Sequence, residues 1–279
     1  MSIFAIADLH LGLSVDKPMD VFGPAWIDHV ERLEKNWREK VTSADTVLIP
    51  GDISWGISME ETLADLQFID DLPGTKILSK GNHDYWWGTT KKVEDFLVDH
   101  DLTTIKILKN KGFVVENTLI AGTRGWILPE NPESKKEDEK IYLREVGRLE
   151  RSLVDSIRAF EEGQAEDKNT DGKALSGDEP EQLQHPEQLQ HPEQLKHPEQ
   201  LKHPDINSVR KIAMLHYPPV YETGCENGFT KTLEKYGFDL CLYGHLHGRA
   251  HQNAFNGEKN GVEYRLIAAD YLKFDPVKV

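Results

Sequence analysis

The chain has 279 residues, of which 48 are acidic and 33 are lysine or arginine, so its formal net charge is −15. An acidic chain is poorly suited to nonspecific binding of nucleic acid, which depends on basic surface. Its apolar runs are all far shorter than the roughly 20 residues that a transmembrane helix requires, so we expect no membrane span.

Short apolar runs that predict buried strands alternate along the chain with segments that predict helices. The predicted strands are residues 3–7, 46–49, 76–78, 113–115, 118–121, 212–215, 240–243 and 262–269. One apolar stripe at helical spacing consists of Trp26, Val30, Leu33 and Trp37, and a second consists of Tyr142, Val146, Leu149, Leu153 and Ile157. Ser58 and Glu61 have the spacing of a capping box. This alternation predicts an α/β protein.

Residues 161–205 interrupt this pattern with a strongly acidic segment. Residues 180–203 are four hexapeptide copies, two of Pro-Glu-Gln-Leu-Gln-His and two of Pro-Glu-Gln-Leu-Lys-His. Proline at every sixth position excludes a continuous α-helix but is compatible with polyproline II. We expect a flexible insertion, following a helix that ends near Phe160, in a single domain spanning residues 1–279. A hexapeptide β-helix, a metal-loading arm made by the repeat histidines, or binding of a protein partner are the alternatives.

Polar clusters directly follow five of the predicted strands. They are Asp8-Leu9-His10, Gly51-Asp52, Gly81-Asn82-His83-Asp84, His216, and Gly244-His245-Leu246-His247. Each cluster alone is compatible with an ordinary turn. Together they predict one site, because the carboxyl ends of strands in an open α/β sheet meet at the edge where ligands bind.

The order of these clusters resembles the pattern of calcineurin-like metallophosphoesterases, which is D-x-H, G-D, G-N-H-[DE], H and G-H-x-H. The resemblance covers residues 3–247 and implies a four-layer α/β/β/α sandwich, here with a low-complexity insertion. It also implies two metal ions. The first would be held by Asp8, His10, Asp52 and His247, and the second by Asn82, His216, His245 and the shared Asp52. The resemblance places His83 near the substrate, where it would stabilise phosphoryl oxygens or protonate the leaving group.

The implied ligands are carboxylates, an amide oxygen and imidazoles without any thiolate, which suits Mn, Fe or Zn, and we favour Mn. Two divalent ions outweigh the two aspartates in charge, so the site would attract a phosphate ester. They would also lower the pKa of bound water and supply a bridging hydroxide as nucleophile. We therefore predict a phosphohydrolase acting on a small phosphomonoester or phosphodiester.

Other residues near these clusters have more than one interpretation. Arg124 is a candidate phosphate ligand, although a loop arginine paired with a carboxylate is equally consistent with the sequence. Trp55, Trp86, Trp87 and Trp126 lie beside the polar clusters as core residues or pocket walls, and His29, His100 and His251 are expected at the surface.

Two positions depart from the family pattern. Ile53 follows Asp52 where some relatives carry an aspartate that could orient the catalytic histidine, so no partner of His83 is identified. Tyr217 stands where many relatives have a second histidine, which weakens the case for a protein phosphatase.

The cysteines and the residues before Asp8 are the features that bear on cellular location. Cys225 and Cys241 have no metal-binding spacing, and no basic, apolar leader precedes Asp8, so we expect a cytoplasmic protein. The alternatives to an enzyme are a noncatalytic scaffold on the same fold and a protein-binding module that acts through the repeats.

Overall fold

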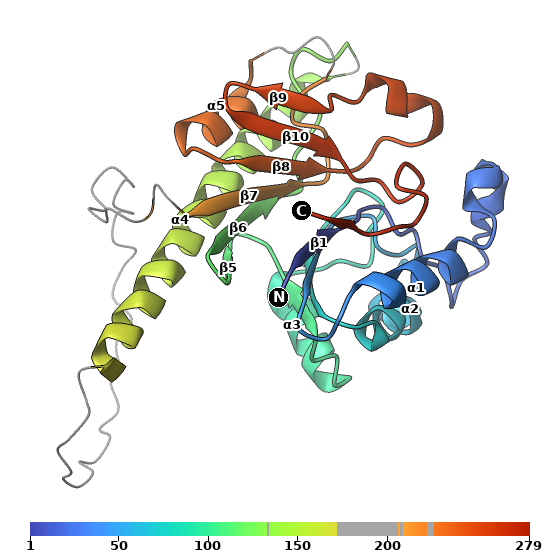
Figure 1. Ribbon diagram of the computed structural model, residues 1–279. Coiled ribbons are helices and arrows are strands. Elements are labelled where there is room, and N and C mark those ends of the chain that lie inside the picture. Colours follow the sequence, from blue (N-terminus) through green and yellow to red (C-terminus); the bar gives the residue numbers. More distant parts are fainter. Residues whose placement is uncertain (133, 172–205, 207–208, 222–225) are drawn as a thin grey trace, which may run out of the picture.

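The computed structural model describes residues 1–132, 134–171, 206, 209–221 and 226–279 (Figure 1). The hexapeptide repeats at 180–203, with the polyproline II conformation expected for them, lie outside the described residues. No helix in the described part of the chain is long and apolar enough to cross a membrane.

The strands form two mixed sheets. The first has the order β11-β1-β2-β3-β4 and consists of β1 (Ile3–Ala5), β2 (Thr46–Pro50), β3 (Thr75–Ser79), β4 (Ile105–Ile107) and the antiparallel edge strand β11 (Val277–Lys278). The second has the order β5-β6-β7-β8-β10-β9. Its strands are β5 (Phe113–Val115), β6 (Thr118–Thr123), β7 (Arg210–Leu215), β8 (Leu240–Tyr243), β9 (Gly257–Lys259) and β10 (Val262–Leu266). Apart from the edge strands β5, β9 and β11, neighbouring strands run parallel.

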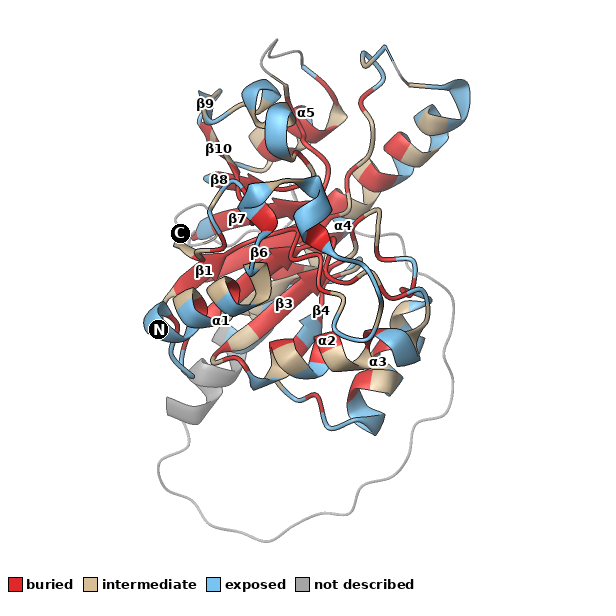
Figure 2. Ribbon diagram, turned by 90° about the vertical axis from the view of Figure 1, so that its right-hand side faces the viewer, coloured by how far each residue is buried: buried red, intermediate tan, exposed pale blue. Residues whose placement is uncertain are grey.

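Three apolar clusters show how the layers are stacked. One packs the outer face of the first sheet against α1 (His29–Lys40), α2 (Met59–Asp71) and α3 (Thr90–Asp99). A second fills the space between the two sheets, and a third packs the second sheet against α4 (Lys136–Asp171) and α5 (Gly228–Lys235). Figures 1 and 2 show the helices on the outside and the buried strands between them. The predicted α/β/β/α sandwich is confirmed.

The helices follow their sequence signals with two differences. The predicted capping box at Ser58 and Glu61 is present at the start of α2. Trp26 is buried with the stripe of α1 but belongs to the 3-10 helix η2 (Pro24–Trp26), which follows η1 (Met19–Phe22). α4 continues past the expected end near Phe160 to Asp171. The extra residues contain no proline, so nothing in them excludes continuation of the helix, although they include Gly163.

The two sheets are joined at their carboxyl ends. Beyond the ends of β1 and β10, Ala7 forms a parallel bridge with Ala268. The Ala7 amide donates to the carbonyl of Ile267 at 2.8 Å, and the Ala269 amide donates to the carbonyl of Ala7 at 2.9 Å. This junction lies directly before Asp8, so it positions the first polar cluster between the two sheets.

Candidate metal centre

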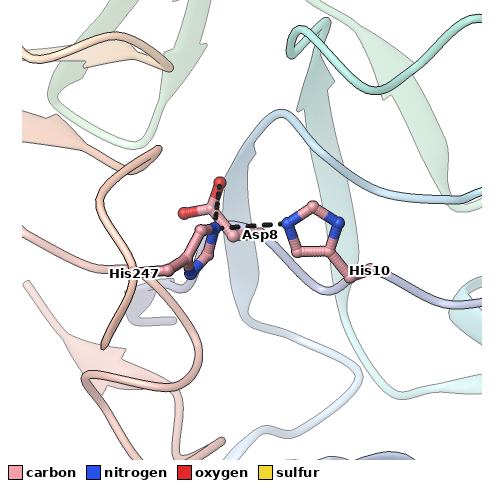
Figure 3. A group of neighbouring side chains, drawn as sticks. All are labelled: Asp8, His10 and His247. Carbon is pink, nitrogen blue, oxygen red and sulfur yellow. Dashed lines mark hydrogen bonds and ion pairs between the residues drawn. The ribbon is translucent and has the colours of Figure 1, made fainter. Parts of the chain in front are cut away.

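The five predicted polar clusters meet at the junction of the two sheets, at the carboxyl ends of β1, β2, β3, β7 and β8. Asp8, His10 and His247 form one group whose ligand atoms all lie within 4.8 Å of one another (Figure 3). His247 Nε2 is 3.2 Å from His10 Nε2 and 3.9 Å from Asp8 Oδ1. Two imidazole nitrogens and a carboxylate thus face one another here and are placed to hold one cation together.

A second group contains the remaining predicted ligands. Asn82 Oδ1 lies 2.6 Å from His216 Nε2 and 2.8 Å from His245 Nδ1, and these two nitrogens are 3.2 Å apart. Asp52 lies between the two groups, since its Oδ2 is 3.7 Å from His10 Nε2 and 3.5 Å from His216 Nε2. The seven side chains therefore form two adjacent sets that share Asp52.

The loops that carry these side chains have unusual backbone conformations. Asp8, His10, Asp52 and His245 have positive φ values of 59°, 46°, 50° and 74°. Such a conformation costs a non-glycine residue roughly 1–3 kcal/mol and persists only where surrounding contacts impose it. Two of those contacts link the first two loops directly: the Asp8 amide donates to Gly51 O, and the His10 amide donates to Asp52 O, both at 3.0 Å.

Burial shapes the charge of the site. Burial lowers the pKa of His10 and His245 well below the usual value and that of His216 to about 3, so these rings are neutral and able to bind a metal. Burial raises the pKa of Asp8 and Asp52, and the charge of Asp52 raises that of Asp8 further, while the charge of His247 opposes both shifts. A donor set of buried imidazoles and carboxylates fits divalent cations.

Asp270 is a residue of this site that the sequence analysis missed. It follows β10, so the same strand-end pattern that identified the other clusters also applies to it. Its Oδ1 accepts a hydrogen bond from His247 Nδ1 at 2.9 Å, and its Oδ2 accepts one from the Gly248 amide at 3.1 Å. Burial lowers the pKa of His247, but the hydrogen bond to Asp270 and the charges of Asp8, Asp270 and Asp52 outweigh burial and raise it to about 9.

His251 also contacts Asp270, with Nε2 3.2 Å from Oδ2. Its side chain is only 22 % exposed, so the expectation that it is a surface histidine was wrong. His29 is likewise half-buried against Trp26 and Phe274, whereas His100 is exposed as expected. The sequence did not indicate this contact, because it joins the 3-10 helix η4 (Gly248–Asn253) to a residue that follows the next two strands, β9 and β10.

Asp84 closes the Gly-Asn-His-Asp cluster and is fully buried. Its Oδ2 accepts hydrogen bonds from the amides of Gly81 at 2.7 Å and Asp52 at 3.0 Å, and its Oδ1 accepts one from Ile53 at 2.8 Å. Burial and the nearby charge of Asp52 raise its pKa to about 6, although these amides favour the ionised form. Asp84 thus fixes the backbone on both sides of Asp52.

His83 lies beside the candidate ligands and packs against an aromatic side chain. Its ring centroid is 4.6 Å from that of Trp55, and its amide donates to Asp52 Oδ1 at 2.8 Å. Its Nδ1 is buried and has no hydrogen-bond partner among the described residues, so the structure identifies no orienting carboxylate.

Of the other aromatic candidates, some lie in the hydrophobic core and one lines a cavity. Trp86 and Trp87 are buried in the core beneath the first sheet, whereas Trp55 lines a cavity beside His83. Tyr217, at the position where many relatives have histidine, lies with its ring centroid 4.2 Å from that of His245. It therefore covers the second ligand group with an aromatic face.

Arg124 is half-buried and lies over the ring of Trp126, with 4.2 Å between the guanidinium carbon and the ring centroid. Its carbonyl accepts hydrogen bonds from the amides of His216 at 3.0 Å and Tyr217 at 2.9 Å. The arginine is thus attached by its backbone to the loop that carries a candidate ligand.

A cavity of about 610 Å³ opens beside the first ligand group. Its polar wall comprises His10, His83, His247 and Asp270. The remaining wall is largely apolar and includes Met19, Phe22, Pro24, Trp26 and Trp55. A molecule bound in this cavity would contact His83 and the first ligand group at once.

Comparison with known proteins identifies one family and several solved structures to which the chain is similar. The model of the calcineurin-like phosphoesterase family matches residues 1–249. No curated protein matches the chain. A protein of unknown function from Aquifex aeolicus, AQ665, is 12% identical, with coverage of 99% of this chain and 95% of that one and a TM-score of 0.44. TT1561 of Thermus thermophilus is 10% identical, with coverage of 88% and 81% and a TM-score of 0.46. Phosphopantetheinyl hydrolase from Mycobacterium tuberculosis is 13% identical, with coverage of 100% and 95% and a TM-score of 0.47.

Proposed function

The chain belongs to the calcineurin-like phosphoesterase family, and from this we propose that it hydrolyses a phosphomonoester or phosphodiester at a centre of two divalent metal ions. The position of Asp52 carries the proposal. Its carboxylate lies between two sets of buried ligands, 3.7 Å from His10 Nε2 and 3.5 Å from His216 Nε2. A shared carboxylate at this position would offset the repulsion between two cations about 3.5–4 Å apart.

We assign the ligands by their grouping around Asp52. The first metal would be held by Asp8, His10, Asp52 and His247, and the second by Asn82, His216, His245 and Asp52. Oxygen and imidazole ligands without thiolate suit Mn, Fe or Zn, and Mn is favoured. When bound, two such ions supply Lewis acidity that activates water and neutralises charge on phosphoryl oxygens.

The protein's own groups would orient the ligands. Because His247 Nδ1 donates to Asp270 at 2.9 Å, its Nε2 is turned toward Asp8 and His10. Such outer carboxylates fix the tautomer and rotation of a ligating imidazole. Asp84 has the corresponding role for the backbone of Asp52.

His83 would act on the substrate rather than on a metal. It lines the cavity, and its ring is held against Trp55 at 4.6 Å. From this position its imidazole would donate a proton to the departing alcohol oxygen or a hydrogen bond to a phosphoryl oxygen. We assign it as the general acid.

The cavity suggests the character of the alcohol part of the substrate. A phosphoryl group at the ligand cluster would direct its ester group into the space bounded by Met19, Phe22 and Trp26. Apolar groups gain roughly 25 cal/mol per Å² when they leave water. We therefore propose that the enzyme prefers esters whose alcohol or second ester group is alkyl or aromatic.

Metal analysis and a substrate panel test the proposal together. Mn-loaded protein should contain two ions per chain and hydrolyse bis-p-nitrophenyl phosphate, p-nitrophenyl phosphate or a cyclic nucleotide. Asp52→Asn should lower turnover by several orders of magnitude, whereas Asp95→Asn, at a half-exposed position on α3, should not. One ion or fewer in active, fully loaded enzyme would refute the dinuclear centre. Two ions without hydrolysis of any ester would favour a noncatalytic scaffold.

A further inference from the structure

A second pocket is lined by basic side chains and by none of the candidate metal ligands. It has a volume of about 150 Å³ and lies between the loop after β4, the end of β6 and helix α4. Its lining contains four cationic side chains and a single acidic one. These are Lys80, Lys109, Arg124, Arg148 and Glu145.

The single carboxylate in this pocket is already engaged. Glu145 is 1% exposed, and its Oε1 accepts a hydrogen bond from Arg148 at 2.5 Å while its Oε2 accepts one from Thr123 Oγ1 at 2.5 Å. Lys80 Nζ donates to the carbonyl of Trp87 at 3.0 Å. Glu145 therefore offsets Arg148, and three further cations remain.

Lys109 and Arg124 are the unusual members of the group. Both are half-buried, yet neither side chain forms an ion pair with a carboxylate of the described residues. Burial lowers the pKa of both, and neighbouring arginines lower it further, while the charge of Glu145 opposes these effects. In a chain with 48 acidic residues and a net charge of −15, unpaired cations that converge in one pocket require a specific reason.

We propose that this pocket binds a phosphoryl group. The planar donor fork of Arg124 suits a tetrahedral oxyanion, and Lys80 and Lys109 add point charges on the same pocket. Pockets for larger organic ligands measure roughly 300–1,000 Å³. A volume of about 150 Å³ instead fits one small anion.

The pocket shares backbone with the second ligand group. The Arg124 carbonyl accepts from the His216 amide at 3.0 Å, and Lys80 directly precedes the loop of Gly81 and Asn82. The anion could be a second phosphoryl group of the substrate or free orthophosphate. In either case the ligand is the same chemical group, and binding would hold the loops of His216 and Asn82 in place.

Thermal unfolding of the full chain tests binding without any reliance on hydrolysis. Orthophosphate, added at constant ionic strength to metal-free protein so that it cannot bind at the metal centre, should raise the Tm of the wild type. Lys109→Ala with Arg124→Ala should weaken phosphate binding at this pocket by about tenfold or more, since charge-assisted hydrogen bonds are lost. The rise in Tm should then disappear. Lys92→Ala with Arg151→Ala removes the same charge from exposed positions and should keep the rise.

Two further variants serve as controls for this test. Lys109→Gln with Arg124→Gln removes both charges but leaves longer, polar side chains than alanine, and it should also lose the rise. It serves as the test if the alanine variant folds poorly. Asp52→Asn alters the metal centre and should keep the rise, so failure of the proposed hydrolysis and failure of this pocket are distinguishable. An equal phosphate response in the wild type and in both pocket variants would overturn the proposal, as would no response in the wild type.

Kinetics distinguish the source of the anion, and this part rests on the proposed phosphohydrolase function. If the substrate supplies it, the pocket variants should raise KM for an ester carrying a second phosphate about tenfold more than they raise KM for p-nitrophenyl phosphate. If free orthophosphate supplies it, the variants should abolish a noncompetitive effect of orthophosphate on p-nitrophenyl phosphate hydrolysis. Either result supports the pocket as a phosphoryl site.

Discussion

Replacing Asp84 by asparagine should weaken both the fold and its metal binding, although Asp84 is itself no candidate ligand. The carboxylate accepts from the amides of Gly81 and Asp52 through Oδ2 and from the Ile53 amide through Oδ1. Trp86 Nε1 also donates to Oδ1, at 3.2 Å. Every described contact of this carboxylate therefore requires an acceptor, whereas an asparagine amide offers one acceptor and one donor.

The size of the effect follows from these contacts. In Asp84→Asn the amino group must face either Gly81 and Asp52 or the donors at Oδ1, so at least two buried N–H groups lose their acceptor. Each unsatisfied buried donor costs about 1–3 kcal/mol, which gives a loss of about 2–6 kcal/mol in the free energy of unfolding. Because Asp52 would shift, Mn affinity should fall roughly 10–100-fold, the usual range for an outer residue of a metal site.

Urea unfolding of metal-free protein and Mn titration measure the two effects separately. Asp45→Asn is the matched control, since Asp45 is also buried and accepts from the amides of Ser2 at 2.6 Å and Thr42 at 2.8 Å. It precedes β2, whereas Asp52 follows that strand. The control should lose stability but keep its Mn affinity. Unchanged Mn affinity in Asp84→Asn would refute the idea that this carboxylate positions Asp52.

Three further predictions concern the cavity and the ligand shell. His83→Ala should keep both metals and lower turnover by ~10²–10⁴-fold, with a smaller loss for esters with good leaving groups; loss of metal would show that His83 is a ligand. Phe22→Ala should raise KM roughly fivefold for decyl p-nitrophenyl phosphate, because about 1 kcal/mol of apolar contact in the cavity is lost, and it should leave KM for methyl p-nitrophenyl phosphate unchanged. Val98→Ala, at an exposed position on α3, is the control. In metal-free protein His247 has a pKa raised to about 9, so the folded state holds more protons than the unfolded state above pH 6.5 and stability falls as pH rises. The fall should be about 2 kcal/mol between pH 6.5 and 8 in urea unfolding. Asp270→Asn should make this fall in stability shallower. An equally steep fall in that variant would contradict its assignment to the contact between His247 and Asp270.

The strand-end pattern accounts for most of what the sequence predicted about the site. Each parallel strand is a short apolar run, and its carboxyl end is marked by the first polar residue after the run. This reasoning placed Asp8, Asp52, His216 and His245 at one edge, where the structure brings them together. It applies equally to Asp270, which directly follows the predicted strand at 262–269, so the sequence contains the signal for this residue as well.

Other features depend on contacts that no local pattern contains. Lys76 lies inside an apolar strand and is fully buried, and its Nζ donates to the carbonyls of Leu72 at 2.5 Å and Gly74 at 2.9 Å. Burial lowers the pKa of this lysine to about 8. The cationic pocket is similar, because Lys109, Arg124 and Arg148 come from three separate elements and meet only in the folded chain.

The backbone of the site shows why folding and function are coupled here. Four candidate ligands have left-handed backbone conformations, which cost free energy for every residue except glycine even though Asp and His adopt them more readily than most, so local preference opposes the arrangement. Hydrogen bonds from distant segments impose it instead, including those from the His245 amide to Asp8 at 3.0 Å and from the His83 amide to Asp52 at 2.8 Å. These bonds come from the protein alone, so packing of the two sheets sets the geometry of the candidate ligands. The bridge between Ala7 and Ala268 joins both sheets directly before the loop of Asp8 and so helps to hold that loop in place.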